Sequence, residues 1–281
     1  MKFLAYLVSG ISLGSIYAII ALGYTMVYGI AKMLNFAHGD VIMVGGYISF
    51  LAVSSLGLPP LVSVLLAMVV CTVLGIIIEA LAYRPLRSAP SLAELITAIG
   101  VSYFLQNSAL LIFGANPKAY SPVVSGTLQL FDGQLSVSYV SLLTVACCLV
   151  IMVALTLFTG KTRMGKAMRA CSEDKGAAQL MGINVNRTIS LTFAIGSALA
   201  AVAGALLCSF SPTLMPTTGS MPGIKAYTAA VFGGILLGVI EALAKAYIST
   251  QLSNSIVFAV LIIILLVRPA GLLGKHTQEK V

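Results

Sequence analysis

Long apolar runs recur from one end of the chain to the other, and they constrain the fold more than any other feature. A helix needs about 20 predominantly apolar residues to cross a bilayer. The apolar segments lie at 3–31, 41–57, 61–83, 94–114, 138–158, 188–209, 226–247 and 255–267. The sequence therefore predicts an all-α, polytopic transmembrane helical bundle of about eight apolar segments, with residues 1–281 forming one membrane domain.

Composition excludes several other classes of protein. Only 9% of the residues are charged, against about a quarter in soluble domains. The first apolar run is too long for a cleavable signal peptide, so we treat it as a retained span. The five cysteines contain no C-x-x-C pair, and neither a disulfide framework nor a metal site is expected.

The net charge of +8 reflects membrane topology rather than a nucleic-acid partner. Short loops rich in Lys and Arg stay on the cytoplasmic side of a membrane. One connection between spans holds six of the sixteen basic residues, which are Lys161, Arg163, Lys166, Arg169, Lys175 and Arg187. We expect this connection, the "YRPLRS" loop and the C-terminal tail inside, and residues 115–138 outside. The stretch "LNFAHGD" (34–40) then lies inside and the N-terminus outside.

A weak internal similarity suggests a repeat. The stretch "LGSIYAIIALG" (13–23) resembles "IGSALAAVAGA" (195–205), and "VGGY" and "IEALA" in the first half precede "FGGI" and "IEALA" in the second. The two copies would cross the membrane in opposite directions. This pattern predicts an inverted-topology repeat, as found in transport proteins.

Residues 160–187 form the largest polar segment expected in the cytoplasm. Ser172 is predicted to cap a short helix, because its hydroxyl can accept a backbone N–H. Glu173 and Asp174 suit the positive end of that helix, and Gly182 can end it in the left-handed conformation.

The side chains on this helix suggest contact with a partner. Ala177 and Ala178 would let a partner backbone approach closely, and Leu180 and Met181 offer apolar contact. An amphipathic segment lying on lipid headgroups is an equally good interpretation of the composition alone.

Three motifs together resemble a known family. The runs "YTMVYGIAKMLNFAHGDVIMVGGY", "RMGKAMRACSEDKGAAQLMGINVNR" and "FAVLIIILLVRPAGLLG" are similar to the LivH-type permease subunits of branched-chain amino acid ABC importers. The resemblance implies a second, related permease subunit, two cytoplasmic ATPase subunits and a periplasmic substrate-binding protein. Substrate selectivity would then lie mainly in the binding protein, so a small amide remains an alternative cargo.

The resemblance also favours a coupling role for the cytoplasmic helix. "GAAQLMG" is similar to the loop by which importer permeases contact their ATPases, although Gly176 stands where many relatives have glutamate. The expected ATPase-coupling residues are Glu173, Asp174, Ala177, Ala178 and Gly182. The chain has no Walker A loop, so no cofactor is expected in it, and ATP and Mg²⁺ would bind to the partner ATPases.

A gradient-driven secondary transporter of small amino acids or amides is the main alternative. Such proteins often carry an acidic residue at membrane depth, and Glu79 and Glu241 are the candidates. Both have structural interpretations, because Glu79 lies near Arg84 in the sequence and Glu241 can pair with Lys245 on one helix face.

"LNFAHGD" is predicted to be a helix break at the inner end of the first span. Asn35 and His38 would cap exposed backbone groups, and Asp40 would favour the start of the next helix. Alternatively, the three side chains line the translocation route. A membrane enzyme using His38 and Asp40 is disfavoured, because residues two apart point to different faces of a helix.

One departure from the family concerns "KAYTAAVFGGILLGVIEALAKAYI" (225–248). Relatives carry a short insert similar to G-S-I-P-G-A between its two apolar halves. We therefore expect that a short connection is missing near Gly233 to Ile235 and that the intact protein turns there.

Overall fold

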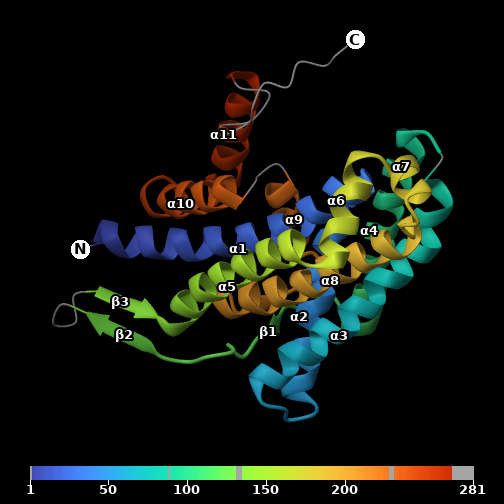
Figure 1. Ribbon diagram of the computed structural model, residues 1–281. Helices are drawn as coiled ribbons and strands as arrows, with labels where there is room; N and C mark the ends of the chain where they lie inside the picture. Colours follow the sequence, from blue (N-terminus) through green and yellow to red (C-terminus); the bar gives the residue numbers. More distant parts are fainter. Residues whose placement is uncertain (1, 88, 131–134, 228–230, 268–281) are drawn as a thin grey trace.

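A computed structural model describes residues 2–87, 89–130, 135–227 and 231–267 (Figure 1). The helices are α1 (Lys2–Ala31), α2 (His38–Ser54), α3 (Pro60–Ile78), η1 (Glu79–Tyr83), η2 (Arg84–Leu86), α4 (Ser91–Phe113), α5 (Tyr139–Lys161), α6 (Arg163–Glu173), α7 (Lys175–Leu180), α8 (Val185–Phe210), α9 (Ser220–Tyr227), α10 (Val231–Tyr247) and α11 (Ser253–Val267). Short strands are β1 (Lys118–Ala119), β2 (Thr127–Leu130), β3 (Leu135–Ser138) and β4 (Thr213–Leu214). The prediction of a mainly helical chain is confirmed.

Five of the described helices are long and apolar enough to cross a membrane. They are Phe3–Ala31, Pro60–Leu86, Leu92–Phe113, Tyr139–Lys161 and Val185–Phe210. The other three apolar segments of the sequence coincide with the shorter helices α2, α10 and α11, of 17, 17 and 15 residues. The prediction of about eight apolar membrane segments is therefore not confirmed, because only five helices of membrane length lie within the described residues.

The N-terminus and the helices of the polar segment 160–187 lie at opposite ends of the molecule. Figure 1 shows the N-terminus and the β2–β3 hairpin at one end and α6 and α7 at the other. Strand β1, which follows α4, pairs antiparallel with β4, which follows α8. Strand β1 belongs to residues 115–138, which the charge pattern places outside. Strand β4 follows the span that leads outward from the segment 160–187, so the pairing of the two strands agrees with the expected topology.

Helix α1 packs closely against α10 through glycines on both helices. Gly10 and Gly14 lie four residues apart on α1, and Gly234 and Gly238 have the same spacing on α10. A Cβ atom added to Gly14 would lie 2.6 Å from the Cα of Ile235. Small residues at this spacing let helix backbones approach, which is how van der Waals contact stabilises helix pairs in lipid.

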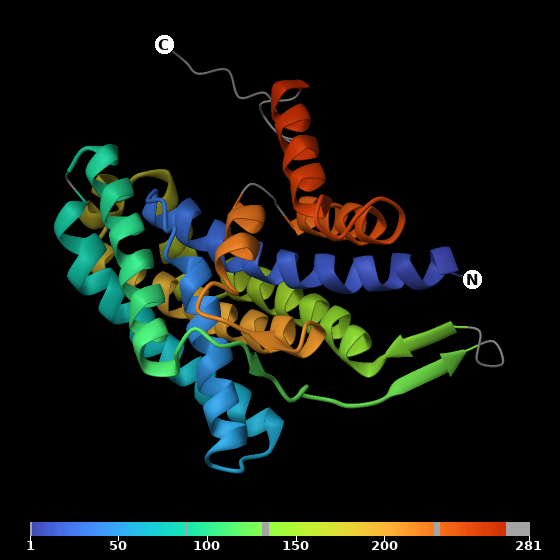
Figure 2. The ribbon, with the colours of Figure 1, turned by 180° about the vertical axis from the view of Figure 1, so that it is seen from behind.

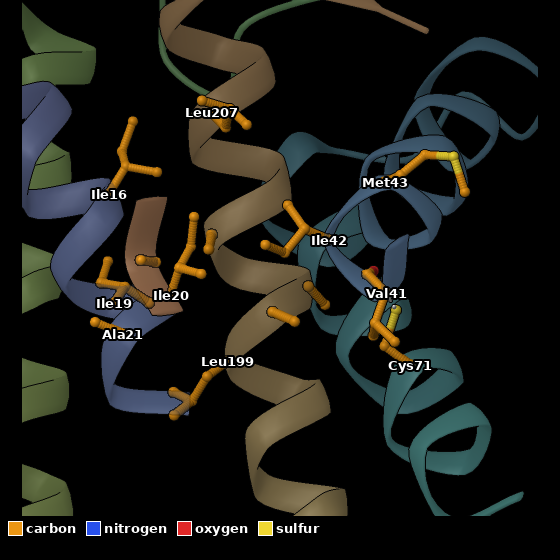
Figure 3. Packing of buried hydrophobic residues seen from close by; sticks show 14 of the residues in the cluster. Ile16, Ile19, Ile20, Ala21, Val41, Ile42, Met43, Cys71, Leu199 and Leu207 are labelled. Carbon is orange, nitrogen blue, oxygen red and sulfur yellow. Dashed lines mark hydrogen bonds between the residues drawn. The ribbon is translucent and has the colours of Figure 1, made fainter. Parts of the chain in front are cut away.

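Helix α8 forms the centre of the hydrophobic core. Figure 3 shows it between α1, which contributes Ile16 and Ile20, and α2, which contributes Ile42. Leu199 and Leu207 of α8 belong to the same buried cluster. In contrast, α3, α4 and α5 expose much of their apolar surface, as expected for helices that face lipid or a partner subunit.

The expected turn at Gly234 is wrong, because α10 is one unbroken helix across residues 233–235. Its glycines face α1, and that close packing requires a regular helix there. Residues 228–230, just before α10, lie outside the described part of the chain. Beyond α10, α11 runs crosswise to α1, as the view from behind shows (Figure 2). Absence of a connecting segment from this chain stays a prediction.

Replacing Gly14 by alanine should weaken the α1–α10 contact. The added methyl group would collide with the Ile235 backbone, and overpacking of this kind costs about 1–3 kcal/mol. Gly29→Ala is the matched control on α1, because a Cβ there meets nothing within 4 Å. We expect a lower thermal unfolding midpoint in detergent for Gly14→Ala alone, and equal midpoints would contradict this packing.

Candidate functional site

The polar segment 160–187 contains two short helices, α6 and α7, and each begins at a capping side chain. Thr162 Oγ1 accepts a hydrogen bond from the Gly165 N–H at 3.0 Å and caps α6. Asp174 Oδ1 accepts from the Gly176 and Ala177 N–H groups, at 2.7 and 3.0 Å, and caps α7. The expectation that Ser172 is the cap is wrong. Ser172 lies inside α6, where its hydroxyl donates to a backbone carbonyl at 2.7 Å.

The end of α7 follows the sequence-based expectation more closely. Gly182 has a φ of +81°, a left-handed conformation that ends the helix at low cost. Asn184 then caps α8 by accepting from the Arg187 N–H at 3.0 Å. Helix α7 thus begins at the Asp174 cap and ends before the left-handed Gly182, a few residues before α8.

The two alanines of α7 face in different directions. Ala178 is 3% exposed and packs in a small cluster with Ile30 of α1 and Met168 and Cys171 of α6. The chain's own helices cover this side chain, and its expected role in contact with a partner stays a prediction. Ala177 is exposed, as are Glu173, Asp174 and Gly182.

Two large apolar side chains project from the end of α7. Leu180 is 90% exposed and Met181 is 83% exposed. Their exposure leaves an apolar patch at the end of the molecule opposite the N-terminus (Figure 1). Together with the exposed Ala177 backbone, this patch can receive the surface of another protein.

Lys175, the first residue of α7, ties this helix to α1. Its Nζ donates to the carbonyl oxygen of Ala31, the last residue of α1, at 2.6 Å. A cation at a helix C-terminus satisfies a free carbonyl and suits the negative end of the helix dipole. Burial and the nearby Arg87 guanidinium lower the pKa of Lys175, and the Glu94 carboxylate opposes that shift.

An ion cluster links the "YRPLRS" loop to the start of α8. The Glu79 carboxylate is fully buried and pairs with both Arg84, at 3.2 Å, and Arg87. Ser190 of α8 donates to the same carboxylate at 2.6 Å, and Arg87 also donates to Asn186. The predicted proximity of Glu79 to Arg84 is confirmed, whereas Arg87 and the α8 partners were not anticipated from the sequence.

Glu241 of α10 is the second buried acid, and basic side chains neutralise its charge as well. Lys225 of α9 and Lys245 contact its carboxylate at 2.6 and 2.7 Å. Tyr17 of α1 donates to it at 2.8 Å, and Lys225 also donates to Asn254 of α11 at 2.7 Å. The predicted pairing with Lys245 is confirmed. Lys225 was missed, because it stands at the edge of an apolar run where a solvated lysine is the ordinary interpretation.

"LNFAHGD" lies deeper in the bundle than the sequence suggested. The His38 ring packs against Gly23 of α1, where an added Cβ would lie 3.1 Å from its Cε1 atom. The distance along α1 from Gly23 to its end at Ala31 corresponds to about 12 Å. The chain therefore runs back into the bundle before α2 begins. Such non-helical backbone is tolerated at membrane depth only where protein or a water-filled cavity surrounds it.

The three polar side chains of this segment have separate surroundings. Asn35 Oδ1 accepts from the Tyr83 hydroxyl at 3.0 Å, and the His38 ring lies edge-on to Tyr24. No side chain caps α2. Neither Asn35 nor His38 therefore caps the first turn of α2, and both side chains are directed toward neighbouring helices. Their capping of other backbone groups stays a prediction. A part in translocation or in the helix break stays a prediction for all three residues.

Asp40 faces the opposite side of α2 from His38. Its Oδ1 accepts from Gln106 Nε2 of α4 at 2.9 Å, and that nitrogen also lies 3.2 Å from the hydroxyl oxygens of Ser102 and Ser220. Gln106 could have been noticed as a polar residue inside an apolar run. Ser220 carries no such signal, because only the fold brings α9 beside the start of α2.

Five membrane-length helices around a buried polar segment indicate a multi-pass membrane protein with a polar interior. Comparison with known sequences is consistent with this class. Residues 6–267 match the model of the family described as "Branched-chain amino acid transport system / permease component". The chain belongs to this family.

Individual relatives agree with that assignment. The permease LivH of Salmonella typhimurium is 45% identical over an alignment that covers 100% of this chain and 98% of the relative. LivH of Escherichia coli is 44% identical with the same coverage, and BraD of Pseudomonas aeruginosa is 43% identical over 99% and 98%. All three are named high-affinity branched-chain amino acid transport system permease proteins. The alignment with the first spans 305 positions, more than the 281 residues of this chain, so that relative contains insertions.

Replacing Glu79 by glutamine should destabilise the cytoplasmic end of the bundle. The amide keeps the shape but leaves Arg84 and Arg87 without a counter-charge, at a cost of about 1–3 kcal/mol because Arg84 is partly solvated. Glu173→Gln is the control, since Glu173 is exposed on the same side. Thermal unfolding in detergent should distinguish the two variants. Identical midpoints would show that the ion cluster contributes no stability.

Proposed function

We propose that this chain is the membrane permease subunit of an ATP-driven importer for branched-chain amino acids. The observation that carries the proposal is the similarity over the full chain to permeases named for that transport. Ion pairs at Glu79 and Glu241 support it over the gradient-driven alternative, because a carboxylate held between two basic groups is poorly placed to bind and release a coupling ion.

The importer would contain a second related permease subunit, two cytoplasmic ATPase subunits and a periplasmic substrate-binding protein. The sequence lacks a Walker A loop, so ATP and Mg²⁺ would bind to the ATPases. Residues 160–187 would be the coupling segment of one permease domain, 1–281, in the bacterial inner membrane. Exposed Leu180 and Met181 at the end of a capped helix support docking of an ATPase there, with lipid headgroups as the alternative contact.

An inverted repeat would account for the way the helices pair. The two similar stretches of sequence lie on α1 and α8. Gly234 of α10 packs against Ala18 of α1, and Gly45 of α2 packs against Ala201 of α8. In the two proposed halves these contacts lie within one residue of corresponding positions, and each first helix packs against the second helix of the other half.

Uptake of leucine into proteoliposomes tests the proposed function. The chain would be reconstituted with its genomic neighbours that encode the second permease, the ATPases and the binding protein. Uptake should require ATP inside the vesicles and the binding protein outside, and it should persist when proton and sodium gradients are abolished. Uptake that follows an ion gradient without ATP would establish the secondary transporter instead.

Replacing Leu180 by aspartate should release the ATPase subunits. Burial of a leucine side chain contributes about 1.5–3 kcal/mol, so its loss should weaken the contact by about tenfold to a hundredfold. The side chain touches little of its own chain, so the permease should still fold. Leu128→Asp, on the β2 strand at the opposite end, is the control. Co-purification of the ATPases measures the effect, and full retention by Leu180→Asp would exclude this docking surface.

A further inference from the structure

Three oxygen atoms converge on one nitrogen between α2, α4 and α9. The nitrogen is Gln106 Nε2, and the oxygens belong to the Asp40 carboxylate and the Ser102 and Ser220 hydroxyls, at 2.9, 3.2 and 3.2 Å. A side-chain amide has only two N–H donors, whereas an ammonium group has three. The arrangement of acceptors therefore suits an ammonium group better than the amide that occupies it.

Asp40 differs from the two other buried acids in its lack of a cation. Glu79 and Glu241 each contact two basic side chains. Asp40 is 1% exposed, and none of the described residues forms an ion pair with it. The first turn of α2 supplies only a partial positive charge, equivalent to about half an elementary charge at a helix N-terminus. A carboxylate at membrane depth without a full counter-charge is costly and indicates a functional site.

The cluster lies near the edge of the described bundle. Ser102 and Gln106 are half-buried on α4, a helix with much of its surface exposed. Asp40 is more deeply buried, in the first turn of α2. The Gln106 side chain therefore lies between the Asp40 carboxylate and the less buried part of the cluster.

We propose that Asp40, Ser102 and Ser220 bind the α-ammonium group of the transported amino acid, and that the Gln106 amide occupies this place in the substrate-free protein. The proposal rests on the proposed function, since the cargo must carry an ammonium group. A zwitterionic substrate would bring the missing positive charge to Asp40. Its carboxylate would be bound elsewhere, and its apolar side chain needs no polar partner.

Asp40→Asn is the decisive variant, because asparagine has almost the same shape, can still accept the hydrogen bond from Gln106 and removes the charge. In the reconstituted importer we expect leucine uptake to fall by about tenfold or more, the factor implied by one lost hydrogen bond to a charged group. ATP hydrolysis stimulated by the binding protein should persist, which shows that the complex has assembled. Asp40→Glu should restore most of the uptake, because it returns the charge.

Ser49→Ala is the matched control, since it removes a buried polar group from α2 away from the cluster. Normal uptake by Asp40→Asn would overturn the proposal, because a purely structural hydrogen bond survives that change. Loss of uptake when choline replaces sodium in the buffer would also overturn the proposal. That result would indicate that the Asp40 carboxylate binds a metal cation. Failure of the unmodified importer to take up leucine would refute the proposed function instead.

Discussion

The close approach of helix backbones at glycine is the constraint on which the rest of this structure depends. Between helices in lipid there is no hydrophobic driving force, so association relies on van der Waals contact and small residues. Gly14 brings α1 against α10, Gly23 brings it against α8, and Gly45 brings α2 against α8. Because α1 and α8 are fixed in this way, the remaining helices can expose their apolar faces to lipid or to partner subunits.

The same packing makes the polar segment 34–40 possible. Non-helical backbone at membrane depth needs surrounding protein, and the small side chain at Gly23 leaves room for the His38 ring beside α1. The segment then turns Asp40 toward α4 and α9 while His38 stays against α1. Polar residues that looked like boundary groups in the sequence are thus internal groups in the fold.

Features set by local chemistry could be predicted from the sequence, and features set by long-range packing could not. The left-handed Gly182 and the pairing of Glu241 with Lys245 depend on near neighbours in the chain. The sequence did not reveal that Asp174, rather than Ser172, caps the helix. Either side chain can accept a hydrogen bond from a backbone N–H, so the cap depends on where the helix begins. Lys225 and Ser220 were missed because their partners lie on distant helices.

Helix α7 and the Asp40 cluster are joined by a short stretch of the chain. Lys175 at the start of α7 holds the carbonyl of Ala31, and the chain from Ala31 leads directly through the buried segment to Asp40. On the other side, Ser190 near the start of α8 holds Glu79 at the inner end of α3. Hydrogen bonds from Lys175 and Ser190 therefore link α7, the end of α1, η1 and α8 at one end of the bundle. Residues 32–37, which precede α2, lie between two packed helices, so side-chain contacts such as that between Asn35 and Tyr83 hold them in place.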